Sequence, residues 1–183
     1  SFTYTAQLAY AMSNYFRSRG IVTVLGGPHA RSYPGDACRY FDFVLGLTDK
    51  DLLKHLLQDF KLNWKEGTYL SASSQPLSIP GVRERWKFIE QVHREPSFIK
   101  VIPMIGSFGC PYHCNFCIDS EIPYQTLDTE IMKSDLRFIL QKMKHPRVGW
   151  YDPNFGIKFD YFMETIESVV PPGSIDFIAE CSL

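Results

Sequence analysis

Three cysteines with the spacing C-x3-C-x2-C, Cys110, Cys114 and Cys117, lie within one short stretch of the chain. Thiolates are the usual ligands of a [4Fe–4S] cluster. Three of them leave one of its four irons open to a small molecule. A structural zinc site, by contrast, normally has four protein ligands. The spacing therefore predicts an iron–sulfur cluster with one reactive corner.

Two other uses of these thiols stay open. His113 could complete a Cys3His zinc site, but it lies between two of the cysteines and no second C-x2-C pair occurs in the chain. A zinc site would make the protein a metal-stabilised β/α scaffold and not an enzyme. A disulfide with one spare thiol would suit a secreted protein, yet the cysteine count of 5 is odd and no secretory signal is evident.

Composition excludes several classes of function. The 183 residues are 45% hydrophobic and 15% aromatic, which is enough to form a packed core. A net charge of −1 argues against binding to nucleic acid or to an anionic membrane. No apolar run approaches the roughly 20 residues of a membrane span. Reduced thiols point to the cytoplasm.

Strands and helices alternate in the first third of the chain. Apolar residues at helical spacing predict helices, and short β-branched runs predict buried strands. Thr48 is the expected N-cap of the last helix. This alternation is typical of a doubly wound parallel sheet. The expected elements are a helix over 4–19, a strand over 21–25, a short helical stretch over 34–40, a strand over 43–45 and a helix over 49–60.

Residues 61–97 break this pattern. Prolines and glycines punctuate a polar stretch here, and we expect an interdomain linker. Its apolar cluster of Trp86, Phe88 and Ile89 is expected to attach it to one of the domains.

A second β/α series begins with the strand that leads into the cysteine loop. Parallel sheets carry their chemistry in loops after the carboxyl ends of the strands, and the cysteine loop has that position. This placement supports the cluster independently of the cysteine spacing. The expected elements are strands over 98–105, 148–151 and 176–180, and helices over 127–143 and 159–170.

The cysteine spacing, with Phe116 before the last cysteine, resembles the signature loop of the radical S-adenosylmethionine (SAM) enzymes. The resemblance implies that Cys110, Cys114 and Cys117 bind the [4Fe–4S] cluster and that Phe116 packs against the cluster or the adenine. It also implies that SAM binds the open iron and is cleaved to a 5′-deoxyadenosyl radical. A reductant such as flavodoxin or ferredoxin would supply the electron. The substrate would be a small molecule that is methylated, cyclised or rearranged at an unreactive carbon.

Further SAM contacts follow from the same resemblance. Tyr151-Asp152-Pro153-Asn154-Phe155 is similar to the D-D-N-F run of the family's cobalamin-dependent members. Asp152 and Asn154 would accept hydrogen bonds from the SAM ammonium, although Asp-Pro-Asn is also typical of a turn. Glu180 would contact the SAM ribose or a substrate, and a plain strand role is equally open.

The first residues resemble the second half of a cobalamin-binding domain of the flavodoxin-like type. The matching positions are Ser1 and Thr3 of an S-x-T motif, and Gly26 and Gly27, which would let the nucleotide tail lie against the backbone. Leu47-Thr48-Asp49 replaces the family's acidic G-E-x-E run, so a degenerate docking domain without cobalamin stays an alternative.

The two resemblances together imply a fold and a domain order. We expect a partial flavodoxin-like parallel sheet of the cobalamin-binding type over 1–60, the linker over 61–97, and the first units of a radical SAM (β/α) partial barrel over 98–183. Each domain matches its family only in part, so the chain is expected to be a fragment of a longer protein.

Overall fold

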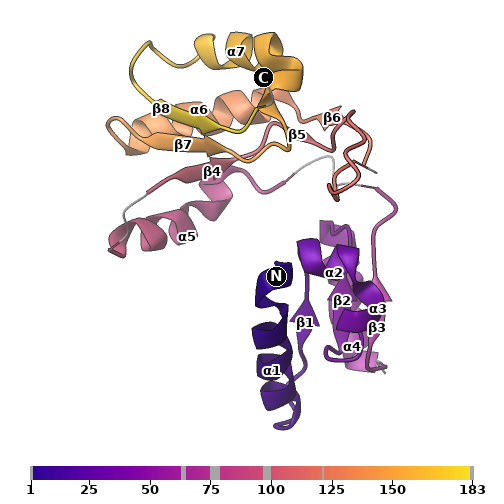
Figure 1. Ribbon diagram of the computed structural model, residues 1–183. Coiled ribbons are helices and arrows are strands. Elements are labelled where there is room, and N and C mark those ends of the chain that lie inside the picture. The colour runs from indigo at the N-terminus through magenta and orange to yellow at the C-terminus, as the bar shows by residue number, and fades with distance from the viewer. Residues whose placement is uncertain (1, 63–64, 75–78, 97–99, 121, 182–183) are drawn as a thin grey trace. The chain divides into compact units, whose positions relative to one another are not determined.

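The computed structural model describes residues 2–62, 65–74, 79–96, 100–120 and 122–181. The chain divides into two compact units, Ser1–Pro76 and Leu77–Leu183. Each unit contains a three-stranded parallel sheet accompanied by helices (Figure 1). The protein is therefore of the α/β class, which confirms that part of the fold prediction.

The first unit is built on the sheet β1-β2-β3, in which all neighbours are parallel. Its strands are β1 (Val24–Leu25), β2 (Phe43–Leu45) and β3 (Thr68–Leu70). The short 3-10 helix η1 (Thr3–Thr5) leads into α1 (Ala6–Arg17), and the remaining helices are α2 (Pro28–Ser32), α3 (Pro34–Ala37) and α4 (Lys50–Leu62).

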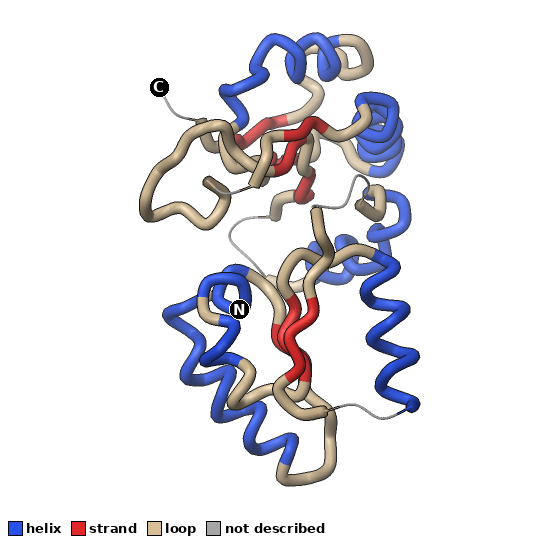
Figure 2. Tube along the Cα trace, turned by 90° about the vertical axis from the view of Figure 1, so that its right-hand side faces the viewer, coloured by secondary structure: helices blue, strands red, loops and turns tan. Residues whose placement is uncertain are grey.

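Both faces of this sheet are covered, as Figure 2 shows for the strands of the first unit. Side chains along a strand alternate between the two faces. Val44 therefore packs with Leu25 and with Ala30 of α2, while Phe43 and Leu45 pack with Leu56 of α4. A buried run of three apolar residues is what a strand covered on both faces requires.

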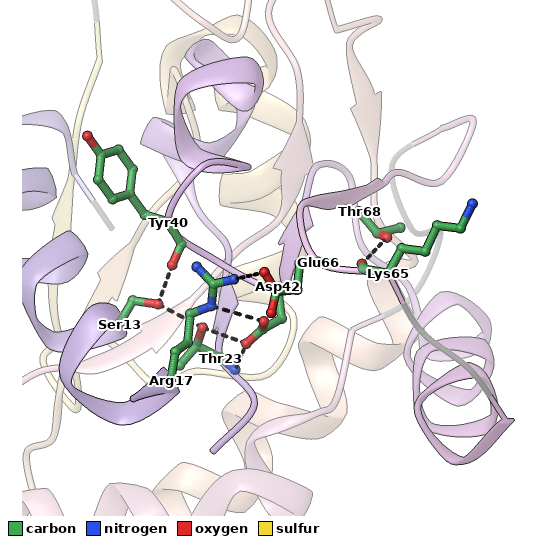
Figure 3. A network of polar contacts seen from close by, with 8 residues as sticks. All are labelled: Ser13, Arg17, Thr23, Tyr40, Asp42, Lys65, Glu66 and Thr68. Carbon is green, nitrogen blue, oxygen red and sulfur yellow. Dashed lines mark hydrogen bonds and ion pairs between the residues drawn. The ribbon is translucent and has the colours of Figure 1, made fainter. Parts of the chain in front are cut away.

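A polar network joins α1 to the beginning of the central strand β2 (Figure 3). Asp42, which is 2% exposed, accepts hydrogen bonds from the backbone N–H of Thr23 (2.7 Å) and from its hydroxyl (3.0 Å). Arg17 donates to the same carboxylate at 3.1 Å and pairs with Glu66 at 2.5 Å. Ser13 contacts the Thr23 hydroxyl at 2.7 Å. The network fixes α1 to the amino ends of the strands.

The second unit has the parallel sheet β4-β7-β8 and a separate antiparallel pair, β5-β6. The parallel strands are β4 (Ile102–Met104), β7 (Arg147–Trp150) and β8 (Asp176–Ala179). The antiparallel pair consists of β5 (Ser107–Phe108) and β6 (Gln125–Thr126). The helices are α5 (Val82–Arg94), α6 (Thr129–Lys142), the 3-10 helix η2 (Phe155–Lys158) and α7 (Phe159–Glu167).

One continuous core joins this sheet to its helices. Ile102, Met104, Val148 and Trp150 alternate toward the same face and belong to one buried cluster with residues of α5, α6 and α7. Phe162 of α7 is fully buried in that cluster and stacks on Phe155 with ring centroids 4.9 Å apart. The core therefore supports the strand ends from which the cysteine loop leaves.

The structure differs from the expected linker over 61–97. Strand β3 pairs with β2, and α5 contacts α6 of the second unit. Trp86 and Ile89 of α5 belong to the second unit's core, whereas Phe88 is 66% exposed. Prolines and glycines here mark the ends of the short strand β3 and of the helix α5, and composition alone does not distinguish this arrangement from a linker.

Element boundaries differ from expectation by a few residues. Asp49, and not Thr48, caps α4, because its Oδ1 accepts the Leu52 N–H at 2.7 Å while the Thr48 hydroxyl donates to the Gly46 carbonyl. Strand β1 is shorter than the expected 21–25. Asp128 caps α6 through the N–H of Glu130, so this helix begins two residues later than expected.

Candidate functional site

The cysteine loop leaves the carboxyl end of β4 and is fastened at both ends by a short antiparallel pair. Ser107 and Phe108 of β5 lie opposite Thr126 and Gln125 of β6. Just outside this pair, the Leu127 N–H donates to the Gly106 carbonyl at 2.7 Å. The chain between β5 and β6 therefore starts and finishes at one point beside the parallel sheet.

Gly109 makes the turn into the loop possible. Its φ of +68° lies in the left-handed region, and a Cβ there would meet the carbonyl oxygens of Ile122 and Pro123, each at 2.4 Å. The next residue, Cys110, donates its N–H to the same Ile122 carbonyl at 3.3 Å. Only glycine combines this dihedral with so close a backbone approach.

The three cysteines are all free thiols in this loop. Cys110 and Cys117 are half-buried and Cys114 is exposed, and the Cys117 N–H donates to the Cys114 carbonyl at 3.0 Å. Within the described ranges, no three His, Cys, Asp or Glu side chains are gathered as the ligands of a metal ion would be. Cys110 lines an open hollow of about 410 Å³ together with His113 and Tyr124.

Asp152 connects the central strand β7 to the start of the loop. Its carboxylate is 2% exposed and accepts hydrogen bonds from the Gly106 N–H at 3.0 Å and from the Ser107 hydroxyl at 2.5 Å. Burial raises the pKa of Asp152, and these hydrogen bonds oppose the rise. Sequence reasoning places Asp152 near bound SAM. The structure places it at the carboxyl end of β7, bound to two donors of its own chain.

The other expected SAM contacts are spread over different environments. Asn154 is buried and accepts the Gly156 N–H at 3.1 Å as the cap of η2. Phe116 is 86% exposed in the loop, and Glu180 is exposed just after β8, where its carbonyl accepts the Phe155 N–H. Asp152, Asn154 and Glu180 all follow the carboxyl ends of β7 or β8, the edge from which the cysteine loop also leaves.

Two polar residues at the base of the loop were missed by the sequence analysis. Ser107 is fully buried. The Tyr124 hydroxyl is also buried, and none of the described residues forms a hydrogen bond of ordinary geometry with it. Burial raises the pKa of Tyr124, while the nearby Ser107 hydroxyl lowers it. A serine just before the cysteine run was the available signal for Ser107. No spacing rule points to Tyr124.

In the first unit, three of the four expected cobalamin positions lie in the described part of the chain; Ser1 lies outside it. Gly26 and Gly27 directly follow β1, and Gly27 has a φ of +98°, which favours glycine. Thr3 is exposed, and its hydroxyl lies 3.3 Å from Nδ1 of the buried His29. The fold thus brings Thr3 near the Gly26-Gly27 turn.

His29 also belongs to a chain of polar contacts. Its Nε2 lies 2.6 Å from the Tyr10 hydroxyl, which donates to Asp36 at 2.8 Å. Burial, with the nearby Asp36 carboxylate, raises the pKa of Tyr10 to about 12. Tyr10 therefore stays protonated at neutral pH and holds the histidine beside Thr3.

Across the described ranges, every helix is too short or too polar to cross a membrane.

No family model and no solved structure matches the chain. It is similar to two curated proteins of Chlorobaculum tepidum. Bacteriochlorophyllide d C-8(2)-methyltransferase is 25% identical over an aligned length of 192 residues, and the alignment covers 99% of this chain and 41% of the relative. Bacteriochlorophyllide d C-12(1)-methyltransferase is 20% identical over 176 residues, and the alignment covers 93% of this chain and 38% of that relative. The chain thus spans about two fifths of the length of these relatives, and the likeness to two methyltransferases supports an enzyme.

Proposed function

We propose that the chain belongs to a radical SAM methyltransferase in which Cys110, Cys114 and Cys117 hold a [4Fe–4S] cluster. One observation carries the proposal: the three thiols lie in a single loop at the carboxyl end of a parallel strand, and Asp152 fastens the base of that loop to the neighbouring strand. The likeness to two methyltransferases over nearly the whole chain supports the reaction class.

The three cysteines fit such a cluster because thiolates are its usual ligands. Three free thiols lie in one loop that is anchored at both ends, and the buried Tyr124 hydroxyl at the base of that loop has no hydrogen-bond partner in the part of the chain that the structure describes. When bound, the cluster would bind SAM at its open iron and supply the electron that cleaves it. Loading requires the three thiols to lose their protons and draw together.

The chain's own residues would position SAM and the substrate. Asn154 and Glu180 lie at the strand edge from which the loop leaves. Glu180 is exposed and would offer carboxylate oxygens to the SAM ribose, and the Asn154 oxygen would use its second lone pair for the SAM ammonium, since the first accepts the Gly156 N–H. Asp152 would act on SAM mainly through the loop, because both of its oxygens already accept hydrogen bonds from Gly106 and Ser107. Phe116, exposed in the loop, would cover the cluster or the adenine.

For the first unit we propose a flavodoxin-like domain of the cobalamin-binding type. Thr3 and the Gly26-Gly27 turn lie near one another, as a site for the cofactor's tail requires. The second unit would be the beginning of a (β/α) partial barrel, since β4, β7 and β8 are parallel and each of the first two is followed by a helix before the next. Bacteriochlorophyllide d, which the relatives' names give, is the first substrate class to test.

Anaerobic loading with iron and sulfide tests the proposal. We expect about four irons and four sulfides per chain, with brown colour, and loss of most iron in Cys114→Ala. Cys38→Ala is the matched control, because Cys38 is a free cysteine of the first unit, and it should load as the unaltered chain does. Uptake of one zinc and no iron, or equal loading of the two variants, would contradict the cluster.

A further inference from the structure

Tyr124 lines the same hollow as the first cysteine of the loop, and its hydroxyl is buried. The antiparallel register ends with Phe108 opposite Gln125, and Tyr124 directly precedes Gln125 at the base of the loop. Its oxygen has no hydrogen-bond partner of ordinary geometry among the described residues. A buried polar atom without a partner carries a cost of about 1–3 kcal/mol, so its presence calls for an explanation.

Three neighbouring residues, Ser107, Cys110 and Asp152, bear on which atom could accept a hydrogen bond from the Tyr124 hydroxyl. The Ser107 hydroxyl donates its proton to Asp152 at 2.5 Å, and it lies close enough to Tyr124 to lower its pKa without meeting hydrogen-bond geometry with the Tyr124 oxygen. Tyr124 and Cys110 line the same hollow, and the Cys110 sulfur and the Asp152 carboxylate both add to the rise in the pKa of Tyr124. At neutral pH the phenol is therefore protonated and able to donate.

A sulfur that ligates a metal is the acceptor that the hollow shared by Tyr124 and Cys110 can offer. A thiol is a weak acceptor, whereas a cysteine that ligates a metal does so as a thiolate and carries negative charge. The Tyr124 donor would therefore gain a strong acceptor only when the loop is loaded.

We propose that Tyr124 donates a hydrogen bond to the Cys110 sulfur when the loop holds its cluster, and that this bond raises the cluster's reduction potential. The inference rests on the proposed function. Hydrogen bonds to the ligating sulfurs are among the features that set the potentials of iron–sulfur clusters. A donor stabilises the reduced state more than the oxidised state, because the reduced cluster carries one more negative charge. Tyr124 is thus a positioning and tuning residue.

Tyr124→Phe tests the inference, with Tyr112→Phe as the matched control. Tyr112 lies in the same loop but is 52% exposed. The unaltered chain and the two variants are loaded anaerobically and their iron content is measured. The midpoint potential of each cluster is then measured by EPR-monitored redox titration. We expect equal iron content, an unchanged potential in Tyr112→Phe and a lower potential in Tyr124→Phe. Equal potentials in all three proteins would overturn the inference while leaving the proposed function in place.

A second measurement uses the unaltered chain and covers the case in which Tyr124→Phe fails to fold or load. The iron–sulfur stretching bands in resonance Raman spectra should shift when H2O is exchanged for D2O, because the donated hydroxyl proton exchanges. The absence of any shift in a loaded sample would overturn the hydrogen bond. Failure of the unaltered chain to take up iron would overturn both the inference and the proposed function on which it rests.

Discussion

Both units bury an aspartate at one end of their central strand, but they balance its charge differently. Asp42 precedes β2 and is paired with Arg17 at 3.1 Å as well as with donors of Thr23. Asp152 follows β7 and is bound through the neutral donors of Gly106 and Ser107. Both carboxylates are 2% exposed, so the difference lies in the partners and not in the burial.

The position of each aspartate explains the difference. Asp42 lies at the amino ends of the strands, where its network joins α1 to β2 and has a structural role. Asp152 lies at the carboxyl edge, where parallel sheets place their chemistry. A buried carboxylate that lacks a cation is costly, and such perturbed groups cluster at functional sites. We therefore expect Asp42 to matter mainly for stability and Asp152 mainly for the geometry of the cysteine loop.

The largest effect is expected for Asp42→Ala. This change leaves the buried Thr23 N–H without its acceptor and removes the partner of Arg17. Breaking a buried charge pair in this way costs about 3 kcal/mol or more. Amide hydrogen exchange should show the loss in the first unit alone, with the second unit unchanged. A loss below about 0.5 kcal/mol would remove the structural role from Asp42.

A second prediction compares two glycines of the second unit with nearly the same backbone dihedral. Gly109 and Gly173 have φ values of +68° and +72°, but a Cβ meets backbone oxygens only at Gly109 and open space at Gly173. Gly173→Ala should cost about 1 kcal/mol from the left-handed dihedral. Gly109→Ala should cost at least about 1 kcal/mol more, since overpacking adds to the strain.

Hydrogen exchange at Ile102–Phe108 and iron loading measure this difference. Gly173→Ala should retain normal loading, whereas Gly109→Ala should lose both protection and iron. Equal effects of the two substitutions would show that the tight approach at the base of the loop is unimportant.

A third prediction concerns pH. The pKa of Asp152 is raised in the folded chain, mainly by burial, so the folded state binds this proton more tightly than the unfolded state. The stability that the proton contributes is present below the unfolded pKa of about 3.9 and is lost as the pH rises through the folded pKa.

Asp152→Asn cannot titrate, so its unfolding free energy relative to the unaltered chain should improve as the pH rises from about 4 and then level off. Urea unfolding at a series of pH values checks the sign. Asp176→Asn, an exposed aspartate at the start of β8, is the control for general charge effects. A relative stability that falls with rising pH would contradict the assigned burial effect.

The smallest effect is expected for Glu66→Gln. Glu66 pairs with Arg17 at 2.5 Å, but its side chain is 70% exposed. Exposed ion pairs contribute about 0.2–1 kcal/mol, so the unfolding free energy should change by less than about 0.5 kcal/mol. A loss as large as that of Asp42→Ala would mean that the network acts as one unit and not through Asp42.

Local patterns predicted much of this fold because the relevant signals lie close together in the sequence. The run Phe43–Leu45 is a strand as expected, since three consecutive apolar residues suit a sheet covered on both faces. The strand β3 was not expected, because Thr68–Leu70 is short and only half-buried at its ends. These residues form a strand because they pair with β2, and the periodicity of a sequence does not show which segments pair.

Local signals point to the residues proposed as ligands, whereas the residues that support their loop were harder to predict. The cysteines are identified by spacing, and Asp152 and Asn154 by a local motif. Ser107 and Tyr124 become part of the site only because β5 and β6 pair across the loop. Likewise, both oxygens of Asp152 turn toward the residues that begin the loop, 46 and 45 positions earlier in the chain. Contacts at such separations cannot be inferred from one sequence.

The most direct test of the central claim is the EPR spectrum of the reduced, iron-loaded chain with and without SAM. If the three cysteines leave one iron open, the signal of the reduced cluster should change when SAM is added, and Cys114→Ala should lose it. A cluster that forms on these cysteines but gives the same spectrum in the presence of saturating SAM would contradict an open iron that binds SAM.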